Sequence, residues 1–236
     1  RIDLNKLRDR YTLFTTTSPS YLFTLSNEIA AAYMDGEGRE KLSQNIELID
    51  KVIKRLNQID RVFVFTGDKD DPTIHDKDNT KLLFRIDGIK GSKVKRILRE
   101  KYNIRLEMSD YYYGLALTTV MNDEDDFEKL ILAVEDIAKK EPYEELNKIS
   151  IKMPTPIMKM KIYDSYYAKK EVVNLKDSIG RISAASVIPY PPGIPLIVPG
   201  EEITQELYDH IMFIMENGLE IVGLMGYNKD QIVVIE

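Results

Sequence analysis

Apolar side chains recur at helical spacing in the first quarter of the chain. Leu22, Leu25, Ile29 and Tyr33 follow one another at three or four positions, which predicts an amphipathic helix. Two glycines then interrupt the pattern, and a second stripe predicts another helix. The apolar positions of this second stripe are Leu42, Ile46, Ile49, Ile53 and Leu56.

The stretch YTLFTTTSPSY, residues 11–21, precedes the first of these helices. Its β-branched and aromatic residues predict a short strand that turns into the helix. Ser18 can act as the N-cap of the helix. Pro19 can be its first residue, because the missing N–H of proline costs nothing at that position.

From residue 60 onward, strand-like and helix-like patterns alternate. The predicted strands are 61–66, 81–86, 104–108 and 115–120, and the predicted helices are 92–102 and 123–138. This order predicts a mixed sheet with helices on it. Prolines and polar residues gather at 141–154, where we expect a domain boundary. The last part should hold short strands, a helix over 203–217 and a final strand, so the expected fold class is α/β and α+β.

Composition narrows the possible functions without choosing one. The net charge of −6 argues against a nucleic-acid-binding surface, which needs clustered Lys and Arg. The chain has no cysteine, and this excludes disulfides, thiolate catalysis and cysteine-based zinc sites. His75 and His210 lie far apart without the spacing of metal ligands, so we expect no metal site.

One uncharged run is long enough to be considered as a membrane-spanning segment. Residues 182–200 carry no charge, and their length approaches the ~20 residues of a membrane-spanning helix. The prolines in this run make a continuous helix untenable. We therefore expect no membrane span and a cytoplasmic protein.

The hydroxyl cluster TTTSP, residues 15–19, is the first candidate site. The start of a helix offers free backbone N–H groups and the positive end of the helix dipole, so such a cluster can bind a phosphate. Plain capping by Ser or Thr explains the same residues and, on spacing alone, is the more common case.

The second candidate is PYPPGIPLIVPGEE, residues 189–202, which holds five of the ten prolines. Proline leaves the backbone little freedom, so the loop can hold Ile194, Leu196 and Val198 against a surface while Glu201 projects from a set position. A carboxylate at the end of an apolar wall suits an ammonium or guanidinium group. Alternatively, the two glutamates begin the following helix, where they would suit its dipole.

The remaining polar clusters carry weaker signals. The acidic loop 67–79 could offer oxygen ligands to calcium, but it lacks the spacing of an EF-hand and is more typical of a solvated surface loop. Of the three tyrosines in SDYYYG, residues 109–114, strand alternation would send neighbours to opposite faces for packing. No nucleophile–base set, phosphate-binding loop or dinucleotide fingerprint is present.

Three stretches are similar to the Orn/Lys/Arg decarboxylase family. They are TTTSPSYLFTLSNEIA, DNTKLLFRIDGIKGSKVKRILREKYNIRLEMSD and GRISAASVIPYPPGIPLIVPGEEIT, and the resemblance covers nearly the whole chain. The family consists of fold type I enzymes that use pyridoxal 5'-phosphate. The resemblance implies an aminotransferase-like small domain over residues 20–145, a small α+β C-terminal domain over 150–236, and a linker over 1–19. It also implies that the large cofactor-binding domain, with the Schiff-base lysine, is absent from this chain.

The resemblance assigns roles to three residues. Thr16 and Ser18 would reach the cofactor phosphate of a neighbouring subunit, which implies a homodimer or larger assembly with shared active sites. Glu201 would hold the distal amine or guanidinium of a basic amino acid: arginine first, with lysine or ornithine as alternatives. The chain alone would then be inactive, and no catalytic residue or metal ligand is expected on it.

The sequence departs from the family pattern at several positions. Ala185 stands where relatives carry a glutamate, and Asn79 stands where they carry a proline. These differences leave room for another substrate or for a paralogue that no longer decarboxylates. The alternative function is a non-catalytic module of the same fold, either for dimerisation or for binding a cationic ligand.

Overall fold

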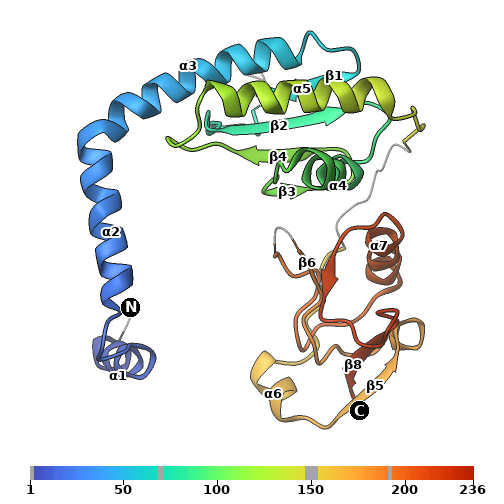
Figure 1. Ribbon diagram of the computed structural model, residues 1–236. Coiled ribbons are helices and arrows are strands. Elements are labelled where there is room, and N and C mark those ends of the chain that lie inside the picture. The colour runs from blue at the N-terminus through green and yellow to red at the C-terminus, as the bar shows by residue number, and fades with distance from the viewer. Residues whose placement is uncertain (1–2, 68–71, 147–153, 191–192) are drawn as a thin grey trace.

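The N-terminal limb of the molecule is a succession of helices. The computed structural model describes residues 3–67, 72–146, 154–190 and 193–236. The limb consists of α1 (Leu4–Phe14), α2 (Tyr21–Tyr33), the π-helical turn η1 (Met34–Gly38) and α3 (Arg39–Leu56). Figure 1 shows α2 and α3 as one bent helix, with α1 at its far end. The two glycines expected to interrupt the helices lie in the π-helical turn and bend the helix without ending it.

The strand expected from residue 11 is absent. Residues 11–14 form the last turn of α1, which begins with a side-chain cap. Asp3 Oδ1 accepts hydrogen bonds from the backbone N–H groups of Asn5, at 3.0 Å, and Lys6, at 3.3 Å. The helix nucleated there continues through the β-branched residues, because helix propagation overrides a weak local strand preference.

The start of α2 also differs from the expectation. Ser18 is not its N-cap and Pro19 is not its first residue, since the helix begins at Tyr21 with Ser20 as N-cap. Thr24 N donates to Ser20 O at 3.1 Å, and this is the first hydrogen bond of the helix. The backbone of Ser18 is instead held in a separate small turn before the helix.

Four strands and three helices build the first hydrophobic core. The strands β1 (Val62–Phe65), β2 (Lys81–Ile86), β4 (Gly114–Leu117) and β3 (Met108–Ser109) lie in this order across one sheet. The helices α4 (Gly91–Tyr102) and α5 (Glu124–Lys140) join α3 to enclose the buried side chains. Every strand pair in the described part of this sheet is antiparallel, so the mixed sheet expected from the strand–helix order has no parallel pair there. The β3–β4 pairing contributes to the difference, because the two strands that follow α4 form an antiparallel hairpin.

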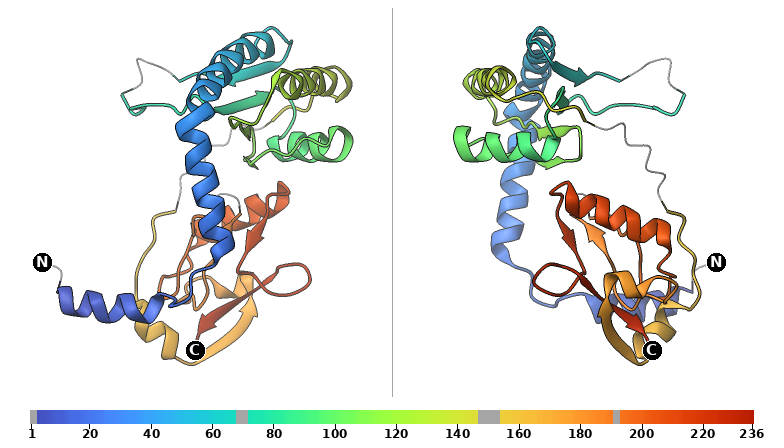
Figure 2. Two further views of the ribbon diagram at one scale, coloured as in Figure 1. Left: turned by 60° about the vertical axis from the view of Figure 1, so that its left-hand side comes forward. Right: turned by 90° about the vertical axis from the view of Figure 1, so that its right-hand side faces the viewer.

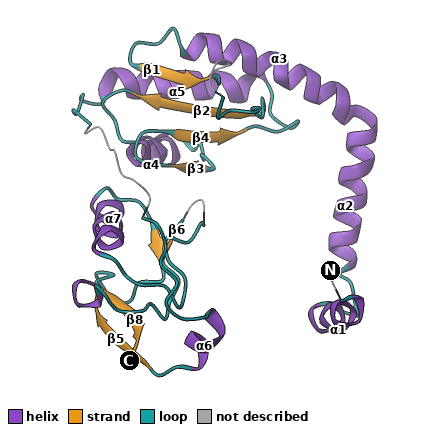
Figure 3. Cartoon of the chain, turned by 180° about the vertical axis from the view of Figure 1, so that it is seen from behind, coloured by secondary structure: helices purple, strands orange, loops and turns teal. Residues whose placement is uncertain are grey.

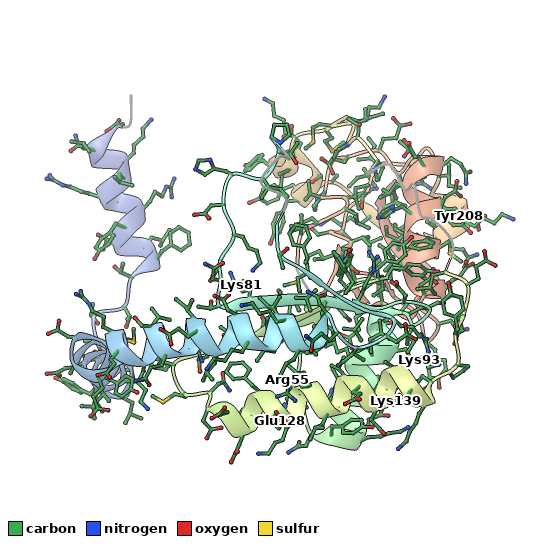
Figure 4. All side chains as sticks on the ribbon, turned by 90° about the horizontal axis from the view of Figure 1, so that it is seen from above. Arg55, Lys81, Lys93, Glu128, Lys139 and Tyr208 are labelled. Carbon is green, nitrogen blue, oxygen red and sulfur yellow. The ribbon has the colours of Figure 1, made fainter. Side chains whose placement is uncertain are left out.

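An ion pair marks the contact between α3 and α5 on the surface of this core. Arg55 Nη2 lies 2.9 Å from Glu128 Oε1, and Figure 4 shows both side chains between the two helices. Both side chains are largely exposed, so the pair adds little to stability. The apolar contacts of the core carry the packing instead, through residues such as Leu56, Phe84 and Val134.

The C-terminal part encloses a second, smaller core. Its elements are α6 (Ile162–Tyr167), β5 (Lys170–Asn174), the 3-10 turn η2 (Leu175–Ser178), β6 (Ile188–Pro189), α7 (Gln205–Glu216), β7 (Ile221–Val222) and β8 (Gln231–Ile235). Strand β5 pairs with β8 and β6 pairs with β7, both antiparallel. Ile203, Ile211 and Ile232 are among its fully buried side chains. The predicted final strand and the helix before it are confirmed.

Polar and aromatic contacts join the two cores. Lys90 Nζ donates to Asn217 Oδ1 at 2.9 Å, and Ser92 Oγ donates to Asn217 O at 3.4 Å. The rings of Tyr111 and Phe213 lie 5.5 Å apart across the same joint. Figure 2 shows α4 of the first core facing α7 of the second. The expected boundary at 141–154 includes residues 147–153, which lie outside the described residues.

Candidate functional site

A short backbone ladder fastens both ends of the proline loop. Val187 N donates to Ile197 O at 3.1 Å, and Leu196 N donates to Val187 O at 2.8 Å. Leu196 is 6% exposed and belongs to the second core, whereas Ile194 is 65% exposed. One side of the described loop therefore packs inside, and the other side presents apolar surface. Residues 191 and 192, two of its prolines, lie outside the described residues.

Glu201 is buried at the end of this loop, with an exposed fraction of 8%. Its Oε2 accepts a hydrogen bond of 2.8 Å from Val198 N, and its backbone N–H donates to Val198 O at 3.2 Å. The carboxylate thus occupies a set position, as predicted, but it turns back onto its own loop and does not project from it. The cause is the tight turn from Val198, which brings a free backbone N–H next to the carboxylate.

The alternative assignment of the two glutamates to the helix start is also wrong. Thr204 is the N-cap of α7, and its Oγ1 accepts from Leu207 N at 3.1 Å. Glu201 and Glu202 lie before this cap in extended bridges with Met158 and Ile182. Thr204 caps the helix because its hydroxyl oxygen can accept a hydrogen bond from the free N–H of the third helical residue.

The backbone conformation explains why a glycine, Gly200, stands directly before Glu201. Its φ of +97° lies in a region that glycine enters freely. A Cβ atom at this position would come within 2.2 Å of Met160 O. Lys159 N and Met160 N both donate to Gly200 O, at 2.9 and 3.0 Å. The backbone at Gly200 therefore lies so close to the backbone of Met160 that no side chain fits between them.

Thr16 and Ser18 lie together in the exposed link between α1 and α2. Thr16 Oγ1 accepts from Ser18 N at 3.3 Å, which closes a small turn. Both residues are exposed, and Ser20 at the start of α2 makes no side-chain capping bond. The hydroxyls are therefore close to a helix start whose N–H groups have no side-chain cap. This arrangement can accept an anion, although it is not itself the capping site that the sequence predicted.

The structure does not bring the two predicted sites together on one chain. Figures 1 and 3 show α1 and α2 standing apart from the C-terminal part that holds Glu201. The apolar stripe predicted for α2 is exposed, and no residue of α2 is buried. Exposed apolar residues of this limb include Leu7, Tyr11, Leu22, Phe23, Leu25 and Ile29.

Sequence reasoning missed the role of the tyrosines that follow β3. Tyr111, Tyr112 and Tyr113 lie in the turn between β3 and β4, so they do not alternate along a strand. Asp110 Oδ1 closes this turn by accepting from Tyr112 N at 2.7 Å and Tyr113 N at 2.6 Å. Tyr111 is thereby directed onto Phe213 of the other core. An aspartate before the tyrosines and a glycine after them were the available turn signals.

Two other kinds of site are missing from the described part of the chain. Within the described ranges, no group of three or more His, Asp or Glu side chains is arranged to hold a metal ion. None of the helices that the structure describes has both the length and the apolar character needed to cross a bilayer.

Comparisons with known proteins agree with the family resemblance. Residues 143–224 match the model of the Orn/Lys/Arg decarboxylase C-terminal domain. An arginine decarboxylase of Bacillus subtilis is 32% identical over 94% of this chain and 46% of its own length. An arginine decarboxylase of Halalkalibacterium halodurans is 33% identical over 97% of this chain and 47% of its own length. The chain thus spans about half the length of these curated relatives.

A solved structure supports the same relationship at the level of the fold. Lysine decarboxylase A from Pseudomonas aeruginosa superposes on the whole chain with a TM-score of 0.77 at 18% sequence identity, and 45% of that protein is covered. The expected α/β and α+β fold class is confirmed by this similarity. The chain carries the C-terminal domain of the Orn/Lys/Arg decarboxylases and corresponds to the C-terminal part of a protein of that family.

Proposed function

We propose that this chain is the C-terminal part of a pyridoxal-phosphate-dependent decarboxylase of a basic amino acid. Arginine is the substrate that we place first, before lysine and ornithine. The observation that carries this choice is that two relatives, aligned over nearly the whole chain, are named arginine decarboxylases. The chain by itself is inactive in this proposal, because the lysine that binds the cofactor belongs to the large domain.

The exposed hydroxyls before α2 are suited to the phosphate group of the cofactor. Thr16 and Ser18 can donate hydrogen bonds, and the adjacent helix start offers free N–H groups. When bound, pyridoxal 5'-phosphate supplies the electron sink for loss of carbon dioxide. The contribution of this chain is to hold the phosphate and so to orient the cofactor.

Glu201 is the group that we assign to the cationic end of the substrate. One of its oxygens is occupied by Val198 N, and this bond fixes the direction of the carboxylate. A carboxylate held in advance loses little entropy when it pairs with a guanidinium or ammonium group. The turn therefore serves recognition by fixing the position of a negative charge at the end of an apolar loop.

The active site in this proposal is shared between two copies of the protein. Thr16 lies between α1 and α2, whereas Glu201 lies between β6 and α7. These parts of the chain stand apart in Figures 1 and 3, so a site that used both residues would draw on a neighbouring subunit. The exposed apolar side chains of α1 and α2 favour an assembly that covers them. We propose a homodimer or larger assembly, with a linker over residues 1–19, a small domain over 20–145 and a C-terminal domain over 150–236.

Expression of the complete reading frame tests this proposal. The purified protein should show the absorbance of bound pyridoxal phosphate and release carbon dioxide from arginine with a higher kcat/KM than from lysine or ornithine. Protein stripped of the cofactor is the control. A complete protein without bound cofactor, or without carbon dioxide release from any of the three amino acids, would favour the non-catalytic module instead.

A further inference from the structure

A cavity lies where α4 of the first core faces α7 of the second. Its volume is about 810 Å³, and its walls come from α4, the turn after β3, the proline loop and α7. Small-molecule sites commonly measure roughly 300–1,000 Å³ and often lie between domains. Thr16, Ser18 and Glu201 do not line it, so it is separate from the groups assigned to cofactor and substrate.

Aromatic rings form one wall of this cavity. Tyr111 is 8% exposed, and its ring packs on Phe213 at 5.5 Å and edge-on against Tyr112 at 4.8 Å. Leu196 and Ile214 continue the apolar lining. A wall of rings already fixed by their neighbours suits a flat apolar ligand, because aromatic pairs stabilise one another beyond simple burial.

The part of the lining that α4 supplies carries positive charge. Lys95, Arg96 and Arg99 line the cavity from successive turns of α4. Arg96 has a single long ion pair, 4.0 Å to Glu100, within the described residues. Neither Lys95 nor Arg99 has an ion-pair partner among the residues that the structure describes. The helix therefore offers at least two cations that are free to pair with a ligand.

The carboxylates around the cavity do not cancel this charge. Asp110 is committed to its own turn, where it accepts two backbone N–H groups. Glu100 is the partner of Arg96. Glu220 is the remaining acid among the described residues of the lining, and it lies beyond the end of α7 rather than on the α4 wall. The wall formed by α4 thus keeps a surplus of positive charge.

His210 adds an unpaired polar atom to the same lining. Its Nδ1 is buried and finds no hydrogen-bond partner among the described residues. Buried polar atoms are nearly always paired in proteins, so an orphan here points to a bound group. The same burial lowers the pKa of His210 below its ordinary value of 6.5. The ring is therefore neutral near pH 7 and does not compete with the α4 cations for an anion.

We propose that this cavity binds a small organic anion built on an aromatic ring. The acid group of the ligand pairs with Lys95 and Arg99, and its ring lies against Tyr111 and Phe213. A basic amino acid would meet like charge on the α4 wall, so the site takes a ligand of a different class from the proposed substrate. Because the ligand would touch both α4 and α7, its binding would hold the two cores together.

Fluorine NMR on the complete protein tests the charge preference directly. The probe is 4-(trifluoromethyl)benzoate, compared with 4-(trifluoromethyl)benzyl alcohol and 4-(trifluoromethyl)benzylamine, which share its ring but are neutral and cationic. We expect the benzoate to bind at least about tenfold more tightly than either of the other probes. This ratio of dissociation constants corresponds to the energy of one charge-assisted hydrogen bond. Equal affinity of the three probes would overturn the proposal.

Charge variants on one helix locate the binding. Lys95→Gln combined with Arg99→Gln should weaken benzoate binding by roughly 10- to 100-fold, since two charged contacts are lost. Lys101→Gln is the matched control, because Lys101 lies on the same helix, outside the lining, and pairs with Glu141 at 3.7 Å. Equal losses in the control and the double variant would place the probe elsewhere and contradict the site.

Two further measurements separate the cavity from the catalytic site. Phe213→Leu keeps an apolar side chain and should weaken benzoate binding about threefold, the order of one lost ring contact. Saturating arginine should leave benzoate binding unchanged, and displacement by arginine would overturn the proposal. Binding is read without any decarboxylation assay, so failure here would leave the proposed function intact. Circular dichroism of each variant shows whether it is folded.

Discussion

The backbone N–H of Val198 donates a hydrogen bond of 2.8 Å to Glu201 Oε2. One carboxylate oxygen therefore closes the turn at the end of the proline loop, and the negative charge is fixed in place by the loop that it ends. A structural role and a role in recognising a cation make different demands on this side chain. The first needs an acceptor oxygen, whereas the second needs the charge, so substitutions can separate them.

Glu201→Gln should therefore leave the fold intact and damage recognition. The amide oxygen can still accept from Val198 N, but the charge is lost. In the complete protein we expect KM for arginine to rise by roughly 10- to 100-fold, the loss of one charged contact of about 1.5–3 kcal/mol. Steady-state kinetics measure this change, and an unaltered KM would remove Glu201 from the substrate site.

Glu201→Ala provides the structural counterpart. This variant removes the acceptor as well as the charge, so the half-buried N–H of Val198 loses its partner. We expect a loss of roughly 1–3 kcal/mol in the free energy of unfolding, in addition to the kinetic effect. Urea unfolding of both variants side by side checks this difference. Equal stability of the two variants would show that the Val198 bond does not support the turn.

Thr16 and Ser18 test whether active sites are shared. Replacing both with alanine should weaken retention of pyridoxal phosphate in the complete protein, because two donors to the phosphate are lost. Mixing this double variant with one that lacks the cofactor-binding lysine should restore part of the activity, since some hybrid dimers contain one intact site. The assay is carbon dioxide release after mixing and reassembly. Absence of any recovery would argue for sites built within one subunit.

Gly200 and Gly180 offer a matched test of backbone constraint. Both have positive φ, +97° and +83°, but a Cβ at Gly200 would meet Met160 O at 2.2 Å, whereas nothing lies within 4 Å of one at Gly180. Gly180→Ala should lower the free energy of unfolding by about 1 kcal/mol, because alanine is disfavoured at a positive φ. Gly200→Ala should lower it clearly more, because the backbone must also shift to make room for the Cβ atom. Urea unfolding measures the stability of both variants. Similar losses would mean that the backbone at Met160 can move away from the added Cβ atom at little energetic cost.

His210 should make the protein sensitive to mild acid. Burial lowers the pKa of His210 below its ordinary value of 6.5, so the unfolded chain takes up a proton before the folded chain does. The stability associated with this group is fully present above pH 6.5 and decreases as the pH falls below that value toward the lower folded-state pKa. His210→Leu should reduce the dependence of the unfolding free energy on pH between pH 7.5 and 5, as measured by urea unfolding at several pH values. An unchanged slope in His210→Leu would contradict the assignment.

Local patterns along the chain determined much of the fold. The stripe from Leu42 to Leu56 predicted a helix because apolar residues at a period near 3.6 must share one face, and α3 contains it. The strand at residues 81–86 and the helix at residues 123–138 were likewise confirmed, apart from small shifts at their ends. The proline-rich motif identified the family, because its spacing is long and specific.

Only the tertiary structure decided how these pieces meet. Strand direction in the first sheet, the inward turn of Glu201 and the packing of Tyr111 on Phe213 all depend on contacts between residues distant in the sequence or on exact turn geometry. Local periodicity shows which side chains share a face, but it does not show what that face will touch. For this reason the sequence alone determined the longer helices of the two cores, several strands and the family. The cavity between α4 and α7 exists only because two separately built cores lie against each other.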